Sequence, residues 1–574
     1  MPRPRLLPCV VLLALAALPT RVAAQRAAPL PLKHRPQPTT AAITAADLMT
    51  RLYIFADDSM MGRETGTAGH LKSTDYIVSE LKRLGLEPAG DDGGYIQNVP
   101  MIRRAFDPAS LITVQGGTLH GGSDFLASAR GVIGSIDRAQ VVFGGTALDT
   151  TNLLTPGQVA GKIVVVRAPA DGQRGGFGGR RGAGGALRAY FESLNGAAAI
   201  ATIVDELSAQ QVQAALRPRD GDVFMKPNDT AGPAPLNLTI TPQAAELLLG
   251  VAPDAATKGQ TGKAVRATLI FHDQAAPARN VVAIVRGGDT TLRNEYVAIG
   301  SHNDHTGLLQ GQPIDHDSLH LYNAARFAIV GLVSRGEQPT AEQQADVAAI
   351  HVNLDSVRKA HPARADSIRN GADDDGSGSV AMLELAEAFA KSQPKPKRSI
   401  LFVWHAGEEK GLLGSRWFAD HPTVPRDAIV AQLNMDMVGR GAARDIPGGS
   451  ADYLQLVGSR RLSTELGDLV ETVNRAEARP FKLDYQFDAP GHPENIYCRS
   501  DHYSYARYGI PIVFFTTGLH GDYHQVTDEP EYIDYPHMAR ISKLVHDVAL
   551  RVANLDHRPV VDKEKPDPNA PCRQ

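Results

Sequence analysis

The second half of this 574-residue chain alternates apolar runs with stretches of helical periodicity, and this pattern constrains the fold more than any other feature. After Pro277 the apolar runs are nearly continuous and five or six residues long: NVVAIV (280–285), YVAIG (296–300), ILFVW (400–404), IVAQLN (429–434) and IPIVFF (510–515). Runs without polar alternation are typical of strands that are buried on both faces. The pattern therefore predicts an α/β fold whose sheet is covered by helices on both sides.

The middle of the chain has a different sequence pattern. Short β-like runs appear there, AQVVF at 139–143 and KIVVV at 162–166, and a chain of this length is too long for one small domain. We therefore predict a β-rich domain inserted into a larger discontinuous one. The expected division is a main domain, an insert and a C-terminal tail, at 41–129 with 276–556, 130–275 and 557–574.

The charge of the chain argues against a nucleic-acid partner. The formal net charge is -4, so no overall basic field would attract a polyanion. The Gly/Arg-rich segment 172–185 is a single run whose one aromatic residue is Phe177, whereas single-strand binding uses repeated stacking residues. We interpret this segment as a mobile surface loop and expect no nucleic-acid binding.

The N-terminus resembles an export signal. MPRPR supplies positive charge, Leu6 to Leu18 is apolar, and Val22-Ala23-Ala24 offers small residues for cleavage before Gln25. The apolar stretch is shorter than the roughly 20 residues of a membrane span, although an uncleaved anchor is the alternative. We therefore predict a signal peptide at 1–24 and a Pro-rich linker at 25–40. The expected protein is exported, periplasmic or secreted, and not stably inserted in a membrane.

The cysteine content limits the kinds of site that the chain can build. Only Cys9, Cys498 and Cys572 are present, too few for a disulfide framework or a thiolate zinc cluster. Any metal must therefore bind through His, Asp and Glu side chains.

Such side chains gather after the predicted strands. They are His302, Asp304 and His305 in SHNDH, Glu408 and Glu409 in HAGEE, Asp436, and His520, Asp522 and His524, with Asp373 to Asp375 before an apolar helix. In an open α/β sheet, ligands bind at the carboxyl ends of the strands. A lone Asp before a helix is usually an N-cap and a lone His is usually solvated, but five segments that converge on one edge favour a metal site.

The adjacent Glu408 and Glu409 support this interpretation. Two neighbouring carboxylates repel each other, and a divalent cation turns that repulsion into ligation. One Glu can bind metal while the other stays free as a general base. Histidine with carboxylates suits zinc, with manganese or cobalt as alternatives, and a two-metal centre needs a carboxylate that contacts both ions.

The order H-x-D, D-x-x-S-G, E-E, a further D and a late His resembles the co-catalytic zinc aminopeptidases of metallopeptidase clan MH. It resembles in particular their family 28, which includes bacterial leucyl aminopeptidases and aminopeptidase Y. The resemblance covers about 45–555, and the middle segment is similar to the protease-associated domain of several members. It implies a three-layer α/β/α sandwich with a mixed, mostly parallel sheet, and a β-rich insert near the active-site entrance.

The resemblance also implies roles for individual residues around two zinc ions. His302 and Asp436 would bind one ion, Glu409 and His524 would bind the other, and Asp374 would contact both. Glu408 would be the general base, and Asp304 would orient His302. The implied function is an exported di-zinc aminopeptidase that removes N-terminal residues from peptides through a metal-bridging hydroxide. A carboxypeptidase or dipeptidase on the same centre is the alternative, and a non-catalytic, receptor-like binding protein is disfavoured because the full ligand set is present.

Three expectations concern the surroundings of this set. His305 and His520 lie off the motif, and we interpret them as residues of the pocket or of the layer behind the ligands. Asp373 and Asp375 would cap the helix or line the site. Roughly 70 residues separate His302 from Asp374, with helical periodicity from Thr340 to Arg358, and this excursion is either a lid or pocket wall, or a peripheral or dimer contact.

Overall fold

The structure is a computed structural model and describes residues 30–128, 130–131, 133–134, 136–169, 185–227, 235–276, 278–331 and 339–574. The predicted signal peptide and almost all of the Gly/Arg-rich segment lie outside the described residues. Within the part of the chain that is described, no helix has both the length and the apolar character needed to cross a bilayer.

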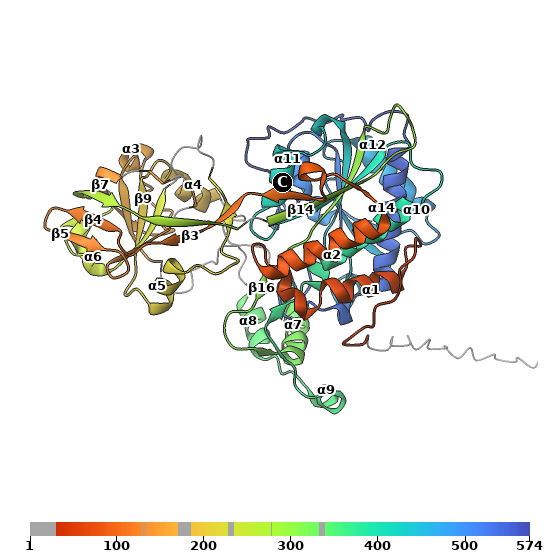
Figure 1. Ribbon diagram of the computed structural model, residues 1–574. Coiled ribbons are helices and arrows are strands. Elements are labelled where there is room, and N and C mark those ends of the chain that lie inside the picture. The colour runs from red at the N-terminus through yellow and green to blue at the C-terminus, as the bar shows by residue number, and fades with distance from the viewer. Residues whose placement is uncertain are drawn as a thin grey trace, which may run out of the picture.

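The largest sheet among the described residues is mixed, as the resemblance implies (Figure 1). Its strands are β1 (Glu87–Pro88), β2 (Ile96–Val99), β14 (Ala278–Val285), β15 (Tyr296–His302), β20 (Ser399–His405), β21 (Ile429–Met435), β22 (Tyr453–Val457), β23 (Lys482–Asp484) and β24 (Ile512–Thr516). The order is β1-β14-β20-β15-β21-β24-β22-β23, and β2 also pairs with β14. The four central strands β20, β15, β21 and β24 run parallel, so their carboxyl ends meet at one edge.

Helices cover both faces of this sheet, which confirms the predicted α/β class. One face carries α1 (Ala45–Phe55), α2 (Ala68–Leu84), α10 (Gly378–Lys391), α12 (Thr464–Ala476) and α14 (Tyr535–Ala553). The other face carries α11 (Leu413–Asp420) and α13 (His502–Ala506).

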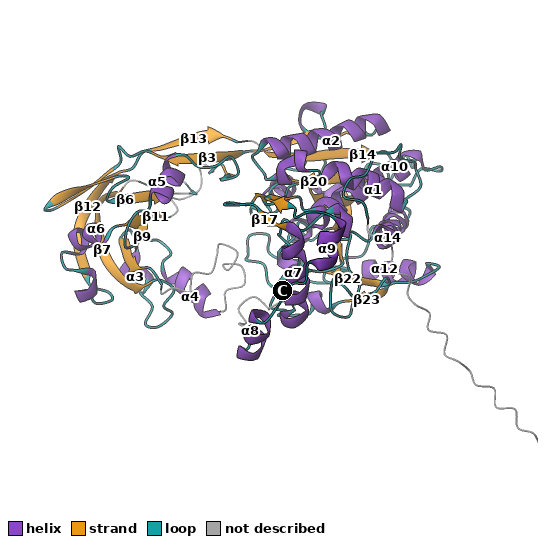
Figure 2. Ribbon diagram, turned by 90° about the horizontal axis from the view of Figure 1, so that it is seen from below, coloured by secondary structure: helices purple, strands orange, loops and turns teal. Residues whose placement is uncertain are grey.

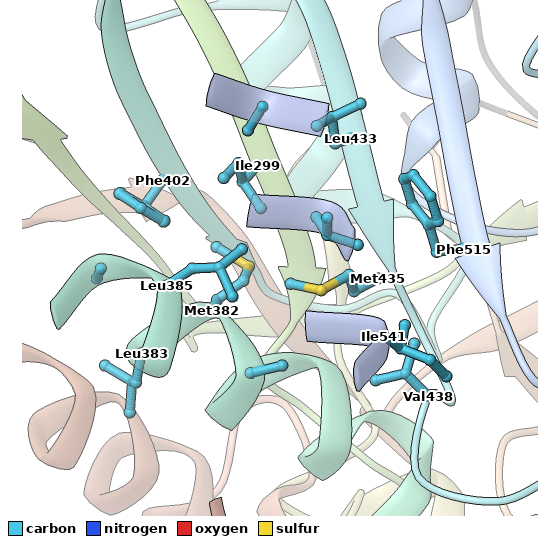
Figure 3. Close-up of a cluster of buried hydrophobic side chains, with 14 of the residues drawn as sticks. Ile299, Met382, Leu383, Leu385, Phe402, Leu433, Met435, Val438, Phe515 and Ile541 are labelled. Carbon is cyan, nitrogen blue, oxygen red and sulfur yellow. The ribbon is translucent and has the colours of Figure 1, made fainter. Parts of the chain in front are cut away.

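Alternate residues of each strand supply the two cores. On β14, Val281, Ala283 and Val285 belong to the core under α10 and α14, whereas Val282 and Ile284 belong to the core under α11 and α13. Figure 3 shows the first core, in which side chains of α10 and α14 meet strand side chains. Burial on both faces explains why these strands lack polar alternation, and it is the main stabilising contribution of this layer.

Helix boundaries follow local capping chemistry. Thr67 accepts a hydrogen bond from the backbone N–H of His70 at the start of α2, and Gly85 ends that helix in the left-handed region at φ 72°. Asp534 caps α14 by accepting from the backbone N–H of His537. These signals are local, so the sequence pattern finds these helices well.

The insert is built on an eight-stranded sheet with its own cores. Its strands are β4 (Leu111–Val114), β5 (Gly117–His120), β6 (Phe125–Ser128), β7 (Ile136–Thr146), β8 (Ile163–Arg167), β9 (Ala199–Ile203), β11 (Leu236–Ile240) and β12 (Thr261–Thr268). Its helices are α3 (Pro156–Val159), α4 (Gly185–Ser193), α5 (Ala209–Leu216) and α6 (Pro242–Leu249). The sheet includes residues 111–128, so the insert starts before the predicted boundary at 130, because β4 pairs with the distant β12.

A three-stranded sheet links the insert to the main domain (Figure 2). It consists of β3 (Met101–Phe106), β10 (Phe224–Met225) and β13 (Phe271–Ala275). Next to β10, Val223 of the insert packs in a small core with Met101 and Ala406. This contact brings the insert beside the turn that carries the glutamate pair.

The excursion between His302 and Asp374 forms short elements at one side of the main domain (Figure 1). They are β16 (Gly307–Leu308), β17 (Ile314–Asp315), α7 (His316–Val330), α8 (Ala341–Ala348), α9 (Asp355–Ala360), β18 (Ala365–Asp366) and β19 (Ile368–Arg369). The predicted helix from Thr340 to Arg358 is therefore two helices with a break between them.

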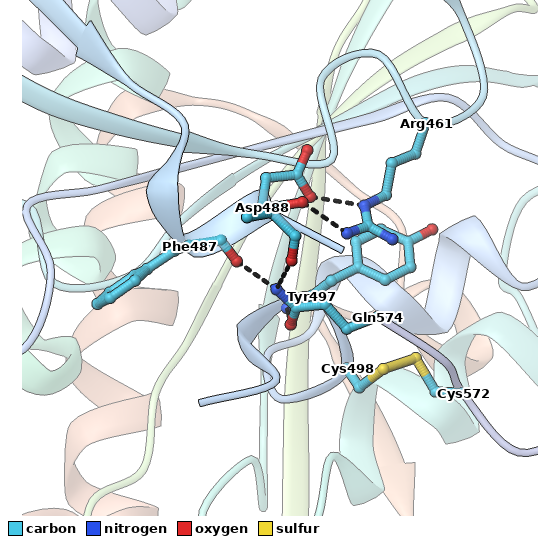
Figure 4. The surroundings of a disulfide bond; sticks show 8 residues. Arg461, Phe487, Asp488, Tyr497, Cys498, Cys572 and Gln574 are labelled. Carbon is cyan, nitrogen blue, oxygen red and sulfur yellow. Dashed lines mark hydrogen bonds and ion pairs between the residues drawn. A yellow bond between two sulfur atoms is a disulfide. The ribbon is translucent and has the colours of Figure 1, made fainter. Parts of the chain in front are cut away.

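Two terminal segments lie against the main domain. The described part of the predicted linker makes contacts there, since Thr39 donates a hydrogen bond to Glu387 of α10 at 2.7 Å. At the other end, Cys498 and Cys572 form a disulfide (Figure 4). Beside it, Gln574 donates to the backbone carbonyl of Phe487 and accepts from the backbone N–H of Tyr497. Two cysteines are too few for a disulfide framework, but this one bond attaches the C-terminal segment to the main domain.

Candidate metal centre

The predicted ligands meet at the edge where the parallel strands end. His302 is the last residue of β15, Glu409 follows β20, Asp436 follows β21 and His524 lies on the loop after β24. Asp374 lies in the turn Ala372–Ser377, just before α10, and its own backbone is not helical. The turn after β20 contains Gly407 at φ 68°, a conformation that glycine adopts without strain. Parallel pairing therefore places side chains from distant segments together.

The first group of donors contains His302, Asp374 and Asp436. His302 Nε2 lies 3.2 Å from Asp374 Oδ1 and 3.7 Å from Asp436 Oδ1. All three residues are buried. Asp436 also accepts a hydrogen bond from Ser500 at 2.8 Å, which holds its other oxygen in place.

The second group contains Asp374, Glu409 and His524, together with His305. His524 Nε2 lies 3.0 Å from Asp374 Oδ2 and 3.1 Å from Glu409 Oε1. His305 Nδ1 lies 2.9 Å from the same Glu409 oxygen. His305 lies outside the motif and was predicted to line the pocket or to lie behind the ligands; the structure places its Nδ1 among the donor atoms.

Asp374 belongs to both groups, through a different oxygen in each. Burial alone would raise the pKa of Asp374, but His302 and His524 hold it well below its usual value, so the carboxylate is ionised. Among the described residues, His302 Nε2, Asp374 Oδ2, Glu409 Oε1 and His524 Nε2 are buried without a hydrogen-bond partner. Buried orphan donors that converge from four segments fit metal cations, which satisfy such groups by ligation.

The turn that holds Asp374 is fixed by its own partners. Asp528 accepts hydrogen bonds from the backbone N–H groups of Asp373 and Asp374 at 3.0 to 3.1 Å. The fully buried Arg63 donates to the carbonyl of Gly371 at 2.8 Å. These contacts position the shared carboxylate before any ligand binds.

The two flanking residues differ: Asp375 caps α10, one of the two predicted possibilities, whereas the Asp373 carboxylate contacts Gly439 and His520. Asp375 accepts from the backbone N–H of Gly378 at the start of α10, at 2.8 Å, and from that of His302 at 3.1 Å. Asp373 accepts from the backbone N–H of Gly439 at 2.7 Å, and its other oxygen lies 3.2 Å from His520 Nε2. His520 therefore lies behind the ligands.

Asp304 contacts its neighbours differently from the prediction. The Nδ1 atom of His302 lies 3.0 Å from the backbone carbonyl of Asp304 and 3.7 Å from its carboxylate. The carboxylate instead accepts from the hydroxyl of Thr65 at 2.7 Å and from the backbone N–H of Glu408 at 3.2 Å. Asp304 thus holds His302 through its main chain and the glutamate turn through its side chain.

Glu408 lines a small pocket beside the two groups. Asp374, Asp436 and Glu408 form its polar wall. The apolar wall is formed by Met437, Phe487, Ile496, Phe514 and Leu519. Burial and the nearby Glu409 and Asp436 raise the pKa of Glu408 well above its usual value, although His302 opposes them. A carboxylate with raised proton affinity beside the donor atoms suits a proton acceptor.

Two further pocket residues escaped the sequence reasoning. Tyr523 lines the pocket and stacks on His524 with ring centroids 3.8 Å apart. Arg499 lines it too, and its guanidinium is paired with Glu494 at 2.9 Å. Tyr523 precedes the predicted ligand His524 in the sequence, whereas Arg499 has no predicted ligand beside it.

The insert approaches this site through one ion-pair cluster. Lys410, next to Glu409, pairs with Glu64 at 2.7 Å. Arg219 of the insert lies 3.8 Å from the same carboxylate. Residues of the insert therefore lie at the rim of the glutamate turn.

Comparison with known proteins gives a consistent result. Residues 336–549 match the family described as Peptidase family M28. Leucine aminopeptidase 1 of Trichophyton rubrum is 27% identical over 236 residues, which cover 39% of this chain and 57% of that protein. Leucine aminopeptidase 1 of Ajellomyces capsulatus is 30% identical over 198 residues, 32% of this chain and 48% of that protein. The match thus spans about half the length of these relatives.

Among solved structures, the aminopeptidase from Aneurinibacillus sp. strain AM-1 aligns over 91% of this chain and 97% of its own, with 16% identity and a TM-score of 0.45.

Proposed function

We propose that this chain, whose residues 336–549 match the family described as Peptidase family M28, is a zinc-dependent aminopeptidase with two metal ions. The observation that carries the proposal is the shared position of Asp374, whose two oxygens face two separate donor groups. One side chain that contacts both groups is what a two-metal centre requires.

The proposed ligands are those of the two groups. His302 and Asp436 would hold one zinc ion, Glu409 and His524 the other, and Asp374 both. Zinc at such a site polarises a peptide carbonyl and lowers the pKa of water toward about 7. Two zinc ions would bring four positive charges against the three negative charges of the ligand carboxylates, and a hydroxide ion would balance the remaining one.

Glu408 would move the proton in this reaction. Its carboxylate lines the pocket beside Asp374 and Asp436, and its main chain is held by Asp304. We propose that Glu408 accepts a proton from the attacking water and passes it to the amine that leaves. The raised proton affinity that burial produces suits both steps.

The pocket favours the N-terminal end of a peptide. Its carboxylates, Asp436 and Glu408, attract a free ammonium group, whereas Arg499 is already paired with Glu494 and is not free for a substrate carboxylate. The apolar wall suits an aliphatic side chain such as that of leucine. Carboxypeptidase or dipeptidase activity is the alternative on the same centre.

We also propose that the protein is exported, to the periplasm or beyond the cell. The Cys498–Cys572 disulfide supports this, because such bonds persist mainly in oxidising compartments. The helices on both faces of the main sheet support the three-layer sandwich of the family, and the separate eight-stranded sheet supports a protease-associated insert beside the site.

Chromogenic substrates test this function. Leucyl-p-nitroanilide, its N-acetylated form and a peptide with a free C-terminus but a blocked N-terminus should be assayed with and without chelator. We expect hydrolysis of the free-amine substrate alone, lost on chelation and restored by zinc. Hydrolysis of the N-blocked peptide from its C-terminus would support a carboxypeptidase, and inactivity of the zinc-loaded protein on all three would support a binding protein.

A further inference from the structure

We propose that His305 is a direct metal ligand, so that the second group of donors has four members and is the tighter of two unequal metal sites. The inference rests on the proposed function in one respect, that metal binds at this centre. It adds a ligand outside the predicted set and an order of binding.

His305 is placed among the donors by the main chain on both sides. It follows β15, forms an isolated bridge with Glu64, and is fully buried. Gly371, at φ 56°, lies against its ring, and a Cβ atom at that glycine would be only 2.5 Å from His305 Cγ. The imidazole is therefore held in one position by a backbone that leaves no room for another side chain.

The ring nitrogens of His305 make no hydrogen bond within the part of the chain that is described. Neither Nδ1 nor Nε2 of His305 has a hydrogen-bond partner there, although the residue is buried. Its Nδ1 lies 2.9 Å from Glu409 Oε1, but the contact lacks hydrogen-bond geometry. A buried imidazole without a hydrogen bond is costly unless another group, such as a cation, satisfies it.

The spacing of the four donors fits one ion. His305 Nδ1 lies 2.9 Å from Glu409 Oε1 and 3.6 Å from Asp374 Oδ2. His524 Nε2 lies 3.1 Å and 3.0 Å from the same two oxygens. Ligand atoms around tetrahedral zinc, with bonds of roughly 2.0 to 2.2 Å, are about 3.3 to 3.6 Å apart. A small outward adjustment would bring the donors to this spacing.

The two groups differ in donor number. His302, Asp374 and Asp436 supply three donors, whereas His305, Asp374, Glu409 and His524 supply four. Zinc sites with four protein ligands are typically closed, and sites with three keep a position for water or substrate. We therefore expect the four-donor site to fill first and the three-donor site to exchange its metal more readily.

A purely positioning role for His305 makes a different prediction. In that case His305 would only orient Glu409 through a hydrogen bond from Nδ1. Asparagine can place an amide N–H near the Nδ1 position, but it is a poor zinc ligand. His305→Asn should therefore restore zinc affinity if His305 positions Glu409, and should fail to restore it if His305 binds metal.

The experiment titrates zinc into the full-length protein after metal removal, by calorimetry and by metal analysis at buffered free zinc. Wild type should bind two ions in two steps. His305→Ala and His305→Asn should both lose at least tenfold in affinity for the tighter step, and cobalt in that site should lose the strong visible absorption of tetrahedral coordination. His421→Ala is the matched control, because His421 is exposed and its ring stacks on Trp417 of α11.

The outcomes separate the two proposals. Two unchanged binding steps in His305→Ala, or wild-type affinity in His305→Asn, would overturn the inference and leave the two-metal centre intact. Absence of zinc binding in wild type would overturn both. Melting temperatures of the metal-free variants should equal that of metal-free wild type, which shows that lost affinity does not reflect misfolding.

Discussion

The backbone N–H of Glu408 donates a hydrogen bond to Oδ1 of Asp304 at 3.2 Å. The other carboxylate oxygen of Asp304 accepts from Thr65 at 2.7 Å, and its carbonyl lies 3.0 Å from His302 Nδ1. One buried residue thus holds both a proposed ligand and the proposed base. Predictions for the site follow from this connection.

Replacement of the proposed base should remove catalysis without removing metal. In Glu408→Gln the amide cannot accept a proton, so kcat should fall by about 100-fold to 10,000-fold. Zinc content should stay at the wild-type level, because Glu408 is not among the donors. Glu342→Gln, at an exposed position of α8, is the control. Near-normal kcat in Glu408→Gln would rule out the assigned base.

Loss of the Asp304 carboxylate should misplace the base. We expect Asp304→Ala to lower kcat by roughly 10-fold to 100-fold, in the range of other losses of supporting contacts around metal sites. Asp304→Asn keeps an oxygen that can accept from Glu408 and should recover part of the activity. Steady-state kinetics with leucyl-p-nitroanilide checks this. Equal losses in both variants would mean that charge, and not the hydrogen bond, is what matters.

The apolar wall of the pocket should set the preference for the first residue. Phe487→Ala and Ile496→Ala each enlarge the space beside Glu408. The preference of the enzyme for leucyl over larger substrates should therefore fall by about 1 to 3 kcal/mol. The measurement is kcat/KM for leucyl, phenylalanyl and alanyl substrates. Val560→Ala, at an exposed position, should leave the order unchanged. Unaltered preference in both pocket variants would place the specificity pocket elsewhere.

The disulfide should stabilise both the fold and the pocket wall. It closes a loop between residues 74 positions apart, for which chain entropy predicts a contribution of up to about 4 kcal/mol. Cys498→Ser with Cys572→Ser should therefore lower the urea midpoint of unfolding. The loop of Phe487 and Tyr497 is held by Gln574 next to the bond, so KM for leucyl substrates should rise (Figure 4). Reductant should reproduce both effects in wild type and neither in the variant.

Stability should rise with pH between about 4 and 6.5 through His70. Burial lowers the pKa of His70 to about 4, with Arg279 and Arg63 adding to the effect and the contact to Asn303 opposing it. The unfolded chain, with a pKa near 6.5, binds the proton that the folded state excludes. The contribution of neutral His70 to the free energy of unfolding is complete above pH 6.5. It is lost as pH falls toward 4, by about 3 kcal/mol.

His70→Gln checks this pH dependence, because an amide N–H can still donate to Asn303, whose oxygen lies 2.8 Å from His70 Nε2. Urea unfolding at pH 5 and pH 7 should show a smaller difference in the variant than in wild type. An identical difference in the two proteins would assign the pH dependence to other groups.

Many strands and helices of this protein can be predicted from local sequence. Apolar runs such as that of Ala278–Val285 predict strands buried on both faces, and caps such as Thr67 and Gly85 mark helix ends. The candidate ligands could also be predicted from the sequence. Parallel strands bring their carboxyl ends to one edge of the sheet, and each ligand follows such a strand or precedes α10. Strand periodicity and strand ends are properties of neighbouring residues, which a single sequence displays.

Other features depended on segments that are distant in the chain. The start of the insert was missed because β4 joins the sheet of the insert by pairing with the distant β12. His305 was predicted to line the pocket or to lie behind the ligands and not to be a ligand, whereas the order of strands in the sheet brings its ring to Glu409. The Asp304 contacts and the Cys498–Cys572 bond also join segments that are distant in the sequence.

The sequence by itself determined the α/β class, the elements and the residue types that gather at the sheet edge. The tertiary structure alone decided which nitrogen and oxygen atoms face one another there, because contact distances depend on how separate segments pack, and packing is a property of the whole chain.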